Sequence, residues 1–220
     1  MRLLKKAIKS FANKLGYKIV PIYPRLIPDE MQKDWQAILE KIGTYNFKFL
    51  NLEVFIPTNL LRIHRLELHQ AKALDILDLG TGTGYFPFIC EYYGHRAWGL
   101  DTGRNVVFND VTRWLGVKRK VWEIKAFEPI PSLGLKFDLI TAYMTNFDRY
   151  GEDVRWGCRE WDYFFQDLAK NHLNPGGRDF LRLNVMPEET RIFFIKHHAI
   201  VNGEEREVYF ESMSSFLALA

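Results

Sequence analysis

The stretch that decides the fold is Asp78-Leu79-Gly80-Thr81-Gly82-Thr83-Gly84, which closes the short apolar run 74–79. Alternating glycines directly after a predicted strand let the backbone turn sharply and approach a ligand where a side chain would collide. Gly99-Leu100-Asp101 ends the next predicted strand, and Asp101 stands 21 residues after Gly80. A carboxylate at that place can accept hydrogen bonds from both hydroxyls of a ribose. We expect Asp101 to be exposed when the site is empty, so its loss should weaken ligand binding and barely change the stability of the empty protein. The two segments together predict a nucleoside-containing ligand at the carboxyl ends of parallel strands.

The glycine spacing differs from that of dinucleotide-binding enzymes. The pattern is G-x-G-x-G rather than G-x-G-x-x-G, and Tyr85 occupies the position of the third glycine. Asp78 adds a carboxylate beside the loop, which would repel a pyrophosphate and attract a cation. S-adenosylmethionine carries a sulfonium and an ammonium and has no phosphate, so the loop favours it over a nicotinamide dinucleotide.

From residue 74 onward, strand and helix patterns alternate. Strands are predicted at 74–79, 97–100, 121–124, 137–143 and 180–183. Helices are predicted at 84–93, 105–115, 160–172 and 188–197. Such alternation is typical of crossover units on a parallel sheet. Asn202-Gly203, between the short runs 199–201 and 207–210, indicates a terminal hairpin that adds antiparallel strands.

The N-terminal part of the chain is predicted to be helical and basic. Leu4, Ile8, Phe11 and Leu15 form one apolar stripe, and residues 1–20 hold six cations and no acid. Such a helix either makes weak contact with an anionic membrane surface or packs its stripe on the protein. Further helices are predicted at 30–42 and 57–71, after a proline-containing connector at 19–28. These patterns divide the chain into an N-terminal helical extension or cap, 1–70, and a ligand-binding domain, 71–220.

The segment from Ile76 to Asp101 resembles motif I, and the acidic residue that follows it, of class I S-adenosylmethionine-dependent methyltransferases. Phe137-Asp138-Leu139-Ile140 is similar to their fourth strand, and Leu173-Asn174-Pro175-Gly176-Gly177 to the turn before their fifth. The resemblance covers about residues 70–211. It implies an α/β, Rossmann-like sheet of seven mostly parallel strands with an antiparallel C-terminal hairpin, preceded by N-terminal helices. Asp179 departs from the family, because it places a charge where the fifth strand is usually apolar.

The resemblance also implies S-adenosylmethionine as the cofactor. The loop 80–84 would wrap the cofactor beside Asp78, which lies near the methionine part. Asp101 would hold the ribose, with Thr102 beside the adenine, and the loop 126–128 is similar to the family's adenine-contacting loop. The implied cofactor-binding residues are Asp78, Gly80, Thr81, Gly82, Gly84, Asp101, Thr102, Ala126, Phe127 and Tyr143.

The segment after the predicted strand 137–143 is expected to open beside the transferred methyl group. Its W-G-x-x-E-W string, 156–161, resembles a group of bacterial methyltransferases of surface-polysaccharide or small-metabolite pathways. Asp148 and Glu160 are the candidate general bases for an acceptor hydroxyl. A surface ion pair for Asp148, or a helix-start acid for Glu160, are the alternatives. Trp156 and Trp161 are expected to stack on a sugar or aromatic acceptor.

Composition and short motifs narrow the remaining classes of protein and of ligand. Hydrophobic residues make up 47% of the chain and charged residues 26%, which excludes a disordered chain. Two cysteines cannot build a disulfide framework, and the six histidines show no metal-ligand spacing. The absence of a [DN]-P-P-[YF] motif and of a Pro-Cys pair argues against DNA methylation, so neither a metal nor a nucleic acid is expected. The predicted location is cytoplasmic, with peripheral membrane contact through the basic helix.

The sequence therefore predicts an enzyme that moves a methyl group from S-adenosylmethionine to a small molecule or glycan, with a hydroxyl favoured over an amine as the acceptor group. Two alternatives stay open. One is an NAD-dependent oxidoreductase that uses the same ribose carboxylate. The other is a non-catalytic nucleoside-binding or membrane-associated scaffold.

Overall fold

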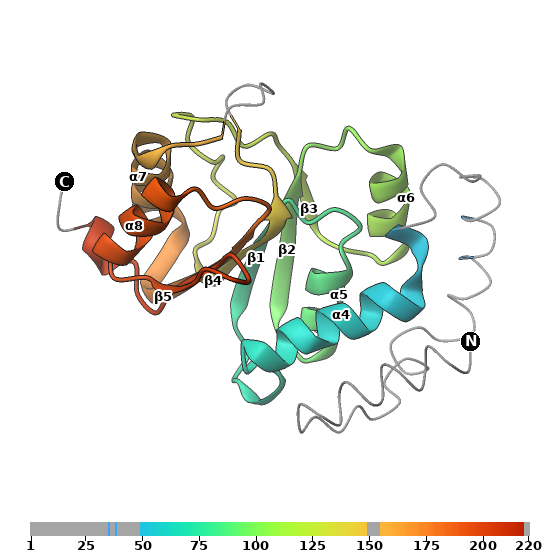
Figure 1. Ribbon diagram of the computed structural model, residues 1–220. Coiled ribbons are helices and arrows are strands. Elements are labelled where there is room, and N and C mark those ends of the chain that lie inside the picture. Colours follow the sequence, from blue (N-terminus) through green and yellow to red (C-terminus); the bar gives the residue numbers. More distant parts are fainter. Residues whose placement is uncertain (1–34, 36–37, 39–48, 149–154, 218–220) are drawn as a thin grey trace.

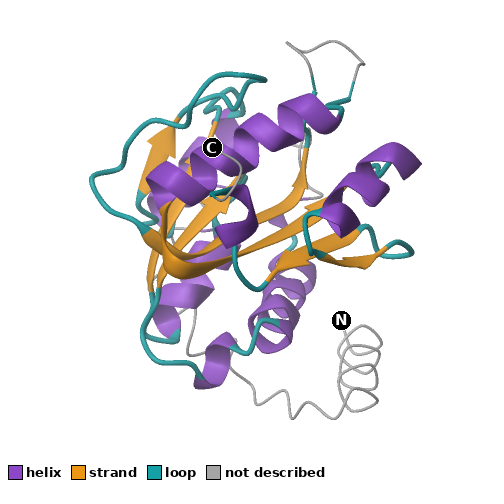
Figure 2. Cartoon of the chain, turned by 90° about the vertical axis from the view of Figure 1, so that its left-hand side faces the viewer, coloured by secondary structure: helices purple, strands orange, loops and turns teal. Residues whose placement is uncertain are grey.

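The computed structural model describes residues 35, 38, 49–148 and 155–217 of the 220-residue chain. A seven-stranded sheet in the order β3-β2-β1-β4-β5-β7-β6 runs through the centre, with helices on both faces (Figures 1 and 2). The strands are β1 (Asp75–Leu79), β2 (Arg96–Asp101), β3 (Arg119–Val121), β4 (Phe137–Thr145), β5 (Leu173–Leu183), β6 (Ile200–Asn202) and β7 (Glu207–Phe210). The helices are α4 (Leu52–Arg65), α5 (Tyr85–Tyr92), α6 (Val106–Trp114), α7 (Cys158–Asp167) and α8 (Glu188–Lys196).

The pairing of the strands confirms the predicted sheet. β1 pairs in parallel with β2 and β4, β3 joins β2, and β5 joins β4, whereas β7 is antiparallel to both β5 and β6. Strand order reverses between β1 and β4, so the switch point of this Rossmann-like sheet lies where those two strands end. Asp78 stands there, opposite Gly99 of β2 and Thr141 of β4. In open α/β sheets the crevice beyond such a point is where ligands bind.

Each face of the sheet has its own hydrophobic core, because successive side chains of a strand point to opposite faces. Leu77 of β1 packs in the core that α7 and α8 cover, together with Phe165. Its neighbour Ile76 packs in the core that α4, α5 and α6 cover, together with Ile63. Asp78 follows the same alternation and lies on the α4 side. The glycine loop thus leaves β1 between two packed layers, which fixes its position.

Helix α4 begins at Leu52, not at Pro57 as the sequence predicted, and ends at Arg65 rather than at 71. Pro57 lies inside the helix, where it has no N–H to donate to the carbonyl of Glu53. Burial outweighs this loss, since Ile56 and Ile63 are fully buried against the sheet. Tertiary packing, rather than the proline signal, decides where the helix starts.

Three other predicted elements differ from the structure, and strand pairing explains the first two. β3 occupies 119–121 instead of 121–124, because its ladder with β2 joins Gly99 to Arg119 and Asp101 to Val121. β5 begins at Leu173 instead of Phe180, and the predicted turn 175–177 is an irregularity within the strand. The predicted helix 160–172 divides into α7 and a π-helical turn at Leu168–His172.

The predicted basic helix within residues 1–20 and the connector 19–28 lie outside the described residues. Of the predicted helix 30–42 only Trp35 and Ile38 are described, and both are helical. Trp35 is buried, and its ring lies 4.6 Å from that of Trp114 at the end of α6.

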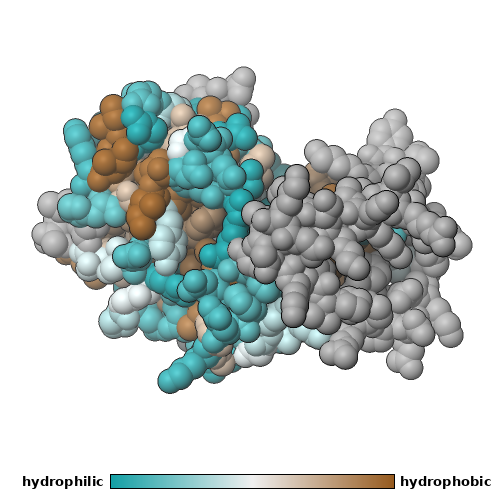
Figure 3. All heavy atoms as spheres, turned by 60° about the horizontal axis from the view of Figure 1, so that its bottom comes forward, coloured by the Kyte–Doolittle hydropathy of each residue, from teal (hydrophilic) through white to brown (hydrophobic). Residues whose placement is uncertain are grey.

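The surface of the described part is mixed in character. No helix in these ranges is long and apolar enough to cross a membrane. Seen from below, hydrophobic side chains gather on the side where α8 lies, among a mostly hydrophilic surface (Figure 3). Exposed isoleucines of this region are Ile192 and Ile195 of α8 and Ile200 of β6.

Candidate functional site

The loop between β1 and α5 requires glycine on two counts, conformation and space. Gly80, Gly82 and Gly84 have φ values of 64°, 57° and 79°, in the left-handed region that side chains disfavour. A Cβ on Gly80 would lie 2.3 Å from Oγ1 of Thr145, at the end of β4. One on Gly84 would lie 2.9 Å from a methyl carbon of Thr112 in α6. The loop is therefore a tight cradle of bare backbone between β4 and α6.

Asp101 holds this cradle from the end of β2. Its Oδ2 accepts a hydrogen bond from the backbone N–H of Gly82 at 2.9 Å. The N–H groups of Gly80 and Thr81 donate to the carbonyl of Leu100 at 2.7 and 3.1 Å. The sequence suggested an exposed carboxylate, free when the site is empty. The structure corrects this, because Asp101 is half-buried and one of its oxygens already anchors the loop.

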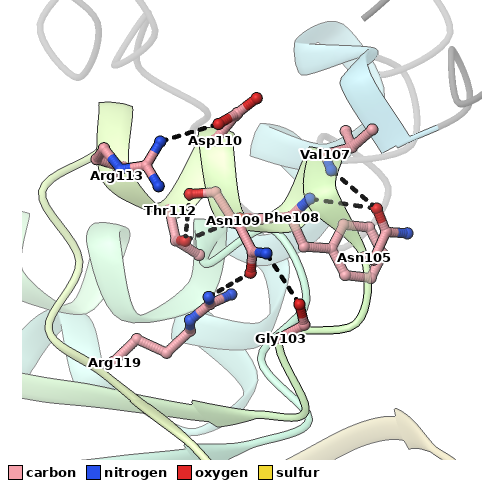
Figure 4. A network of polar contacts seen from close by, with 9 residues as sticks. All are labelled: Gly103, Asn105, Val107, Phe108, Asn109, Asp110, Thr112, Arg113 and Arg119. Atoms are coloured by element: carbon pink, nitrogen blue, oxygen red, sulfur yellow. Dashed lines mark hydrogen bonds and ion pairs between the residues drawn. The ribbon is translucent and has the colours of Figure 1, made fainter.

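The segment after Asp101 is fixed by polar contacts to α6 and β3 (Figure 4). Asn105 caps α6 by accepting from two N–H groups of its first turn, at 3.0 and 3.4 Å. Asn109 donates to the carbonyl of Gly103 at 2.9 Å, and the guanidinium of Arg119 donates to the Asn109 side chain. Thr102 is exposed within this fixed segment. It is thus presented to solvent directly beside Asp101.

Asp78 is buried on the α4 side of the sheet, with 4% of its surface exposed. The hydroxyl of Thr141 donates to its Oδ1 at 2.8 Å. Burial raises the pKa of Asp78 to about 6, against the hydroxyls of Thr81 and Thr141 and the nearby Arg62 guanidinium, all of which lower it. A cationic ligand group next to this carboxylate would favour its ionised form.

Arg62 of α4 lies over the ring of Tyr143, with its guanidinium carbon 3.7 Å from the ring centroid. Its Nη1 donates to Oδ1 of Asn59 at 2.8 Å, and it forms no ion pair with any residue in the described ranges. Burial lowers the pKa of Arg62, and burial also raises the pKa of Tyr143. Tyr143 in turn packs between Phe86 and Phe180, at 5.5 and 5.3 Å.

Sequence reasoning missed Arg62, although it named Tyr143 and Asp78. The available signal was a cation between apolar positions of the predicted helix 57–71. Nothing local in the chain shows that this helix crosses the end of β4. The structure brings Arg62, Asp78 and Tyr143 to the same end of the sheet, since the charge of Arg62 lowers the pKa of both other groups.

The two residues assigned to adenine contact, both in the loop after β3, differ in exposure. Ala126 is buried in the core beneath α7. Phe127 is 47% exposed and has a φ of 59°, and the edge of its ring meets Tyr163 at 5.8 Å. This exposure excludes ordinary core packing for Phe127. A non-glycine residue in the left-handed region is uncommon and often accompanies function.

A small cavity of about 20 Å³ lies beyond the ends of β4 and β5. Thr145, which touches the position of Gly80, is part of its wall, so the cavity adjoins the glycine cradle. Trp156 and Trp161 also line it, but each is only 2% exposed. Their rings pack on Phe147 at 5.0 and 4.8 Å. The expectation that both tryptophans stack on an acceptor is corrected, because these rings form a buried aromatic wall.

Neither candidate base lines that cavity. Glu160 is buried and accepts from the N–H of Gly157 at 2.9 Å, which is the role of a helix-start acid. Asp148 is half-buried, and its backbone carbonyl accepts from Nε1 of Trp156 at 2.6 Å. Asp148 and Arg155 also form an isolated antiparallel bridge. A catalytic role for either acid stays a prediction.

No protein-family model matches the sequence, and no curated protein matches it. Solved structures are similar over part of the chain. One is an S-adenosylmethionine-bound amino pentose methyltransferase, CalS10, from Micromonospora echinaspora, with 20% identity, a TM-score of 0.41 and coverage of 60% of this chain and 52% of that one. DesVI of Streptomyces venezuelae has 19% identity, a TM-score of 0.46 and coverage of 66% and 57%.

A ribosomal protein L11 methylase from Lactobacillus delbrueckii subsp. bulgaricus has 16% identity, a TM-score of 0.44 and coverage of 70% and 74%. This chain spans little more than half the length of the first two proteins. Partial likeness at this level does not specify an activity, because one fold carries many functions. The function has to be argued from the site itself.

Proposed function

We propose that this chain is an S-adenosylmethionine-dependent methyltransferase that acts on a hydroxyl, or else an amine, of a small molecule or glycan. The observation that carries the proposal is the contact between Asp101 and the Gly82 N–H, which joins the ribose-type carboxylate to the glycine cradle. The cradle follows β1 at the switch point of the sheet, and Asp101 ends the neighbouring strand β2. When bound, the cofactor supplies a methyl group on a positively charged sulfur.

The charges around the cradle support this cofactor. Asp78 offers a buried carboxylate suited to an ammonium, and Arg62 offers a half-buried guanidinium without an ion-pair partner in the described ranges. The methionine part of the cofactor carries one ammonium and one carboxylate. A buried charge without a partner is costly, so a ligand that neutralises both groups is favoured. A pyrophosphate, by contrast, would meet the Asp78 carboxylate.

The remaining groups would position the nucleoside and the acceptor. Oδ1 of Asp101 makes no hydrogen bond within the described ranges and is suited to a ribose hydroxyl. Exposed Phe127 offers an aromatic face for the adenine. Tyr143, beneath α4, would form one wall of the cofactor site. Methyl transfer is an in-line displacement, so positioning supplies most of the rate. Asp148 or Glu160 would take the proton of an acceptor hydroxyl.

Binding separates this proposal from the oxidoreductase alternative. S-adenosylmethionine, S-adenosylhomocysteine and NAD are titrated into the full chain by calorimetry. The proposal expects one site for the first two ligands and no competition by NAD. Binding of NAD in their place would support the oxidoreductase.

Turnover separates the proposal from a non-catalytic scaffold. The full chain is incubated with methyl-labelled S-adenosylmethionine and a panel of sugars, glycans and small alcohols and amines, and label in the acceptor fraction is measured. Transfer to one class identifies the acceptor atom. Tight cofactor binding without transfer to any member would support the scaffold.

A further inference from the structure

The cavity beyond β4 and β5 is unusual in the polar groups that face it. Arg155 lines it, and the guanidinium forms no ion pair or side-chain hydrogen bond with any residue in the described ranges. Thr190 lines it as well; the residue is only 1% exposed, and its hydroxyl has no hydrogen-bond partner among the described residues. No acidic side chain from the described ranges is part of the wall.

The N-terminus of α8 adds a third group of donors. Pro187, at the N-cap position, and Thr190, in the first turn, both belong to the wall. Pro187 provides no side-chain cap, so the first N–H groups of this nine-residue helix have no cap to accept from them. The positive end of the helix dipole therefore faces the cavity. Glu188 and Glu189 of the same turn are exposed, and Glu188 pairs with Arg191 at 2.6 Å.

These donors have one chemistry in common. A guanidinium, an unpaired buried hydroxyl and an uncapped helix N-terminus all donate hydrogen bonds and favour negative charge. Asn184 is also in the wall, but its amide N–H groups already donate to Met144 and Asn146, so it adds no donor for a ligand. A buried donor without an acceptor costs free energy, so these groups favour a ligand that accepts hydrogen bonds.

We infer that this cavity binds an oxyanion of the acceptor, so that the substrate of the proposed methyl transfer is an acidic small molecule or acidic sugar. Thr145 lies in the wall of the cavity and against Gly80, which puts the anion one side chain away from the cofactor cradle. A cavity of about 20 Å³ admits little more than one water-sized group. That size fits one oxygen of a carboxylate or of a phosphate ester, rather than a whole sugar.

The assignment of this anion to the acceptor rests on the proposed function, but anion binding itself can be tested without it. Wild-type protein is titrated with acetate, glucuronate and inorganic phosphate, and with neutral glucose, at constant ionic strength. Melting temperature and calorimetric heat are both recorded. We expect saturable stabilisation by at least one of the anions and none by glucose. The carboxylates and the phosphate distinguish the two sources of the oxyanion.

Variants locate the site. Arg155→Gln is expected to weaken anion binding by about 10- to 100-fold, as for a lost charge-assisted hydrogen bond, and Arg155→Lys to recover part of it. Thr190→Val is expected to weaken anion binding while keeping or raising the melting temperature of the free protein, because it removes an unpaired buried hydroxyl. A merely structural threonine would lose stability instead. Arg159→Gln is the matched control, since Arg159 is exposed on α7 and lies outside the cavity wall.

The outcomes keep the two proposals apart. No response to any anion, or an equal response in wild type and Arg155→Gln, overturns the anion site even if S-adenosylhomocysteine binds. An anion response that Arg155→Gln abolishes, without S-adenosylhomocysteine binding, supports the anion site and contradicts the methyltransferase proposal. With both present, acidic acceptors should be methylated in preference to their neutral counterparts.

Discussion

Asp101 and Gly82 are joined by a 2.9 Å hydrogen bond from the loop N–H to the carboxylate Oδ2. One residue thereby has two tasks, since the same carboxylate that would hold a ribose also fixes the backbone that would surround the cofactor. Loss of Asp101 is therefore expected to affect the empty protein as well as the ligand complex. The sequence alone suggested an effect on binding only.

Asp78→Asn should stabilise the empty protein above pH 6. Burial raises the pKa of Asp78 from 3.8 to about 6, so the folded state holds this proton more tightly than the unfolded state. Stability is then lost as pH rises from about 4 to about 6, and the whole loss corresponds to about 3 kcal/mol. Denaturant unfolding of both proteins at pH 5 and pH 8 measures about half of this loss, because pH 5 lies midway in the titration. A variant that is less stable than wild type at pH 8 would contradict the argument.

The same carboxylate should make cofactor affinity depend on pH. An ammonium group favours ionised Asp78, so the dissociation constant of S-adenosylhomocysteine should rise as pH falls below about 6. Asp78→Asn should bind more weakly at pH 8 and lose most of this pH dependence. Calorimetric titration from pH 5 to pH 8 checks both points. A parallel pH profile in the two proteins would show that Asp78 does not face the ligand.

Gly80→Ala should destabilise the protein and impair the cradle. The new Cβ would lie 2.3 Å from Oγ1 of Thr145, and φ is 64°. Thr145→Ala removes the two nearest atoms and leaves only its Cβ at 3.0 Å. The double variant should therefore recover part of the lost stability, leaving about 1–2 kcal/mol of left-handed strain. Thermal unfolding of both single variants and the double variant gives the coupling. Strict additivity would contradict the clash.

Asp179→Val should raise stability, most of all at high pH. Asp179 lies in β5 with 0% exposure, and neither carboxylate oxygen has a hydrogen-bond partner among the described residues. Burial raises its pKa well above its usual range, so ionisation is opposed in the folded state and stability is lost as pH rises. Replacing an unpaired buried polar group by an apolar one is worth about 1–3 kcal/mol. The gain should shrink from pH 8 toward pH 4. A loss at pH 8 would indicate a hidden partner.

The general-base hypothesis concerns rate. With an identified acceptor, Asp148→Asn or Glu160→Gln should keep cofactor affinity and lose about 10²- to 10⁴-fold in turnover if that residue is the base. Glu160→Gln retains an oxygen that can accept from the Gly157 N–H, so its fold should survive. Near-normal turnover of both variants would leave positioning as the whole mechanism.

The pattern of the sequence was enough to predict the sheet and the cradle, because both depend on local signals. Apolar runs mark β1 and β4, and the glycines and Asp101 stand at set distances along the chain. The features that the sequence did not predict depend on contacts between segments distant in the chain. The overlap of Arg62 with Tyr143 follows from how α4 crosses the sheet, and the early start of α4 follows from burial of Ile56. The oxyanion cavity joins Arg155 to the first turn of α8, which no local pattern connects.

The most direct test of the account is a calorimetric titration of S-adenosylhomocysteine into wild-type protein and Asp101→Ala. Hydrogen bonds to a charged acceptor contribute about 1.5–3 kcal/mol each, so the variant should bind on the order of 10²-fold more weakly. Its melting temperature without ligand should also fall, because the Gly82 N–H loses its acceptor. Asp110→Ala in α6, outside the cradle, serves as the control and should bind as wild type does. An unchanged dissociation constant in Asp101→Ala, or no binding by wild type, would contradict the assignment of the cradle to this cofactor.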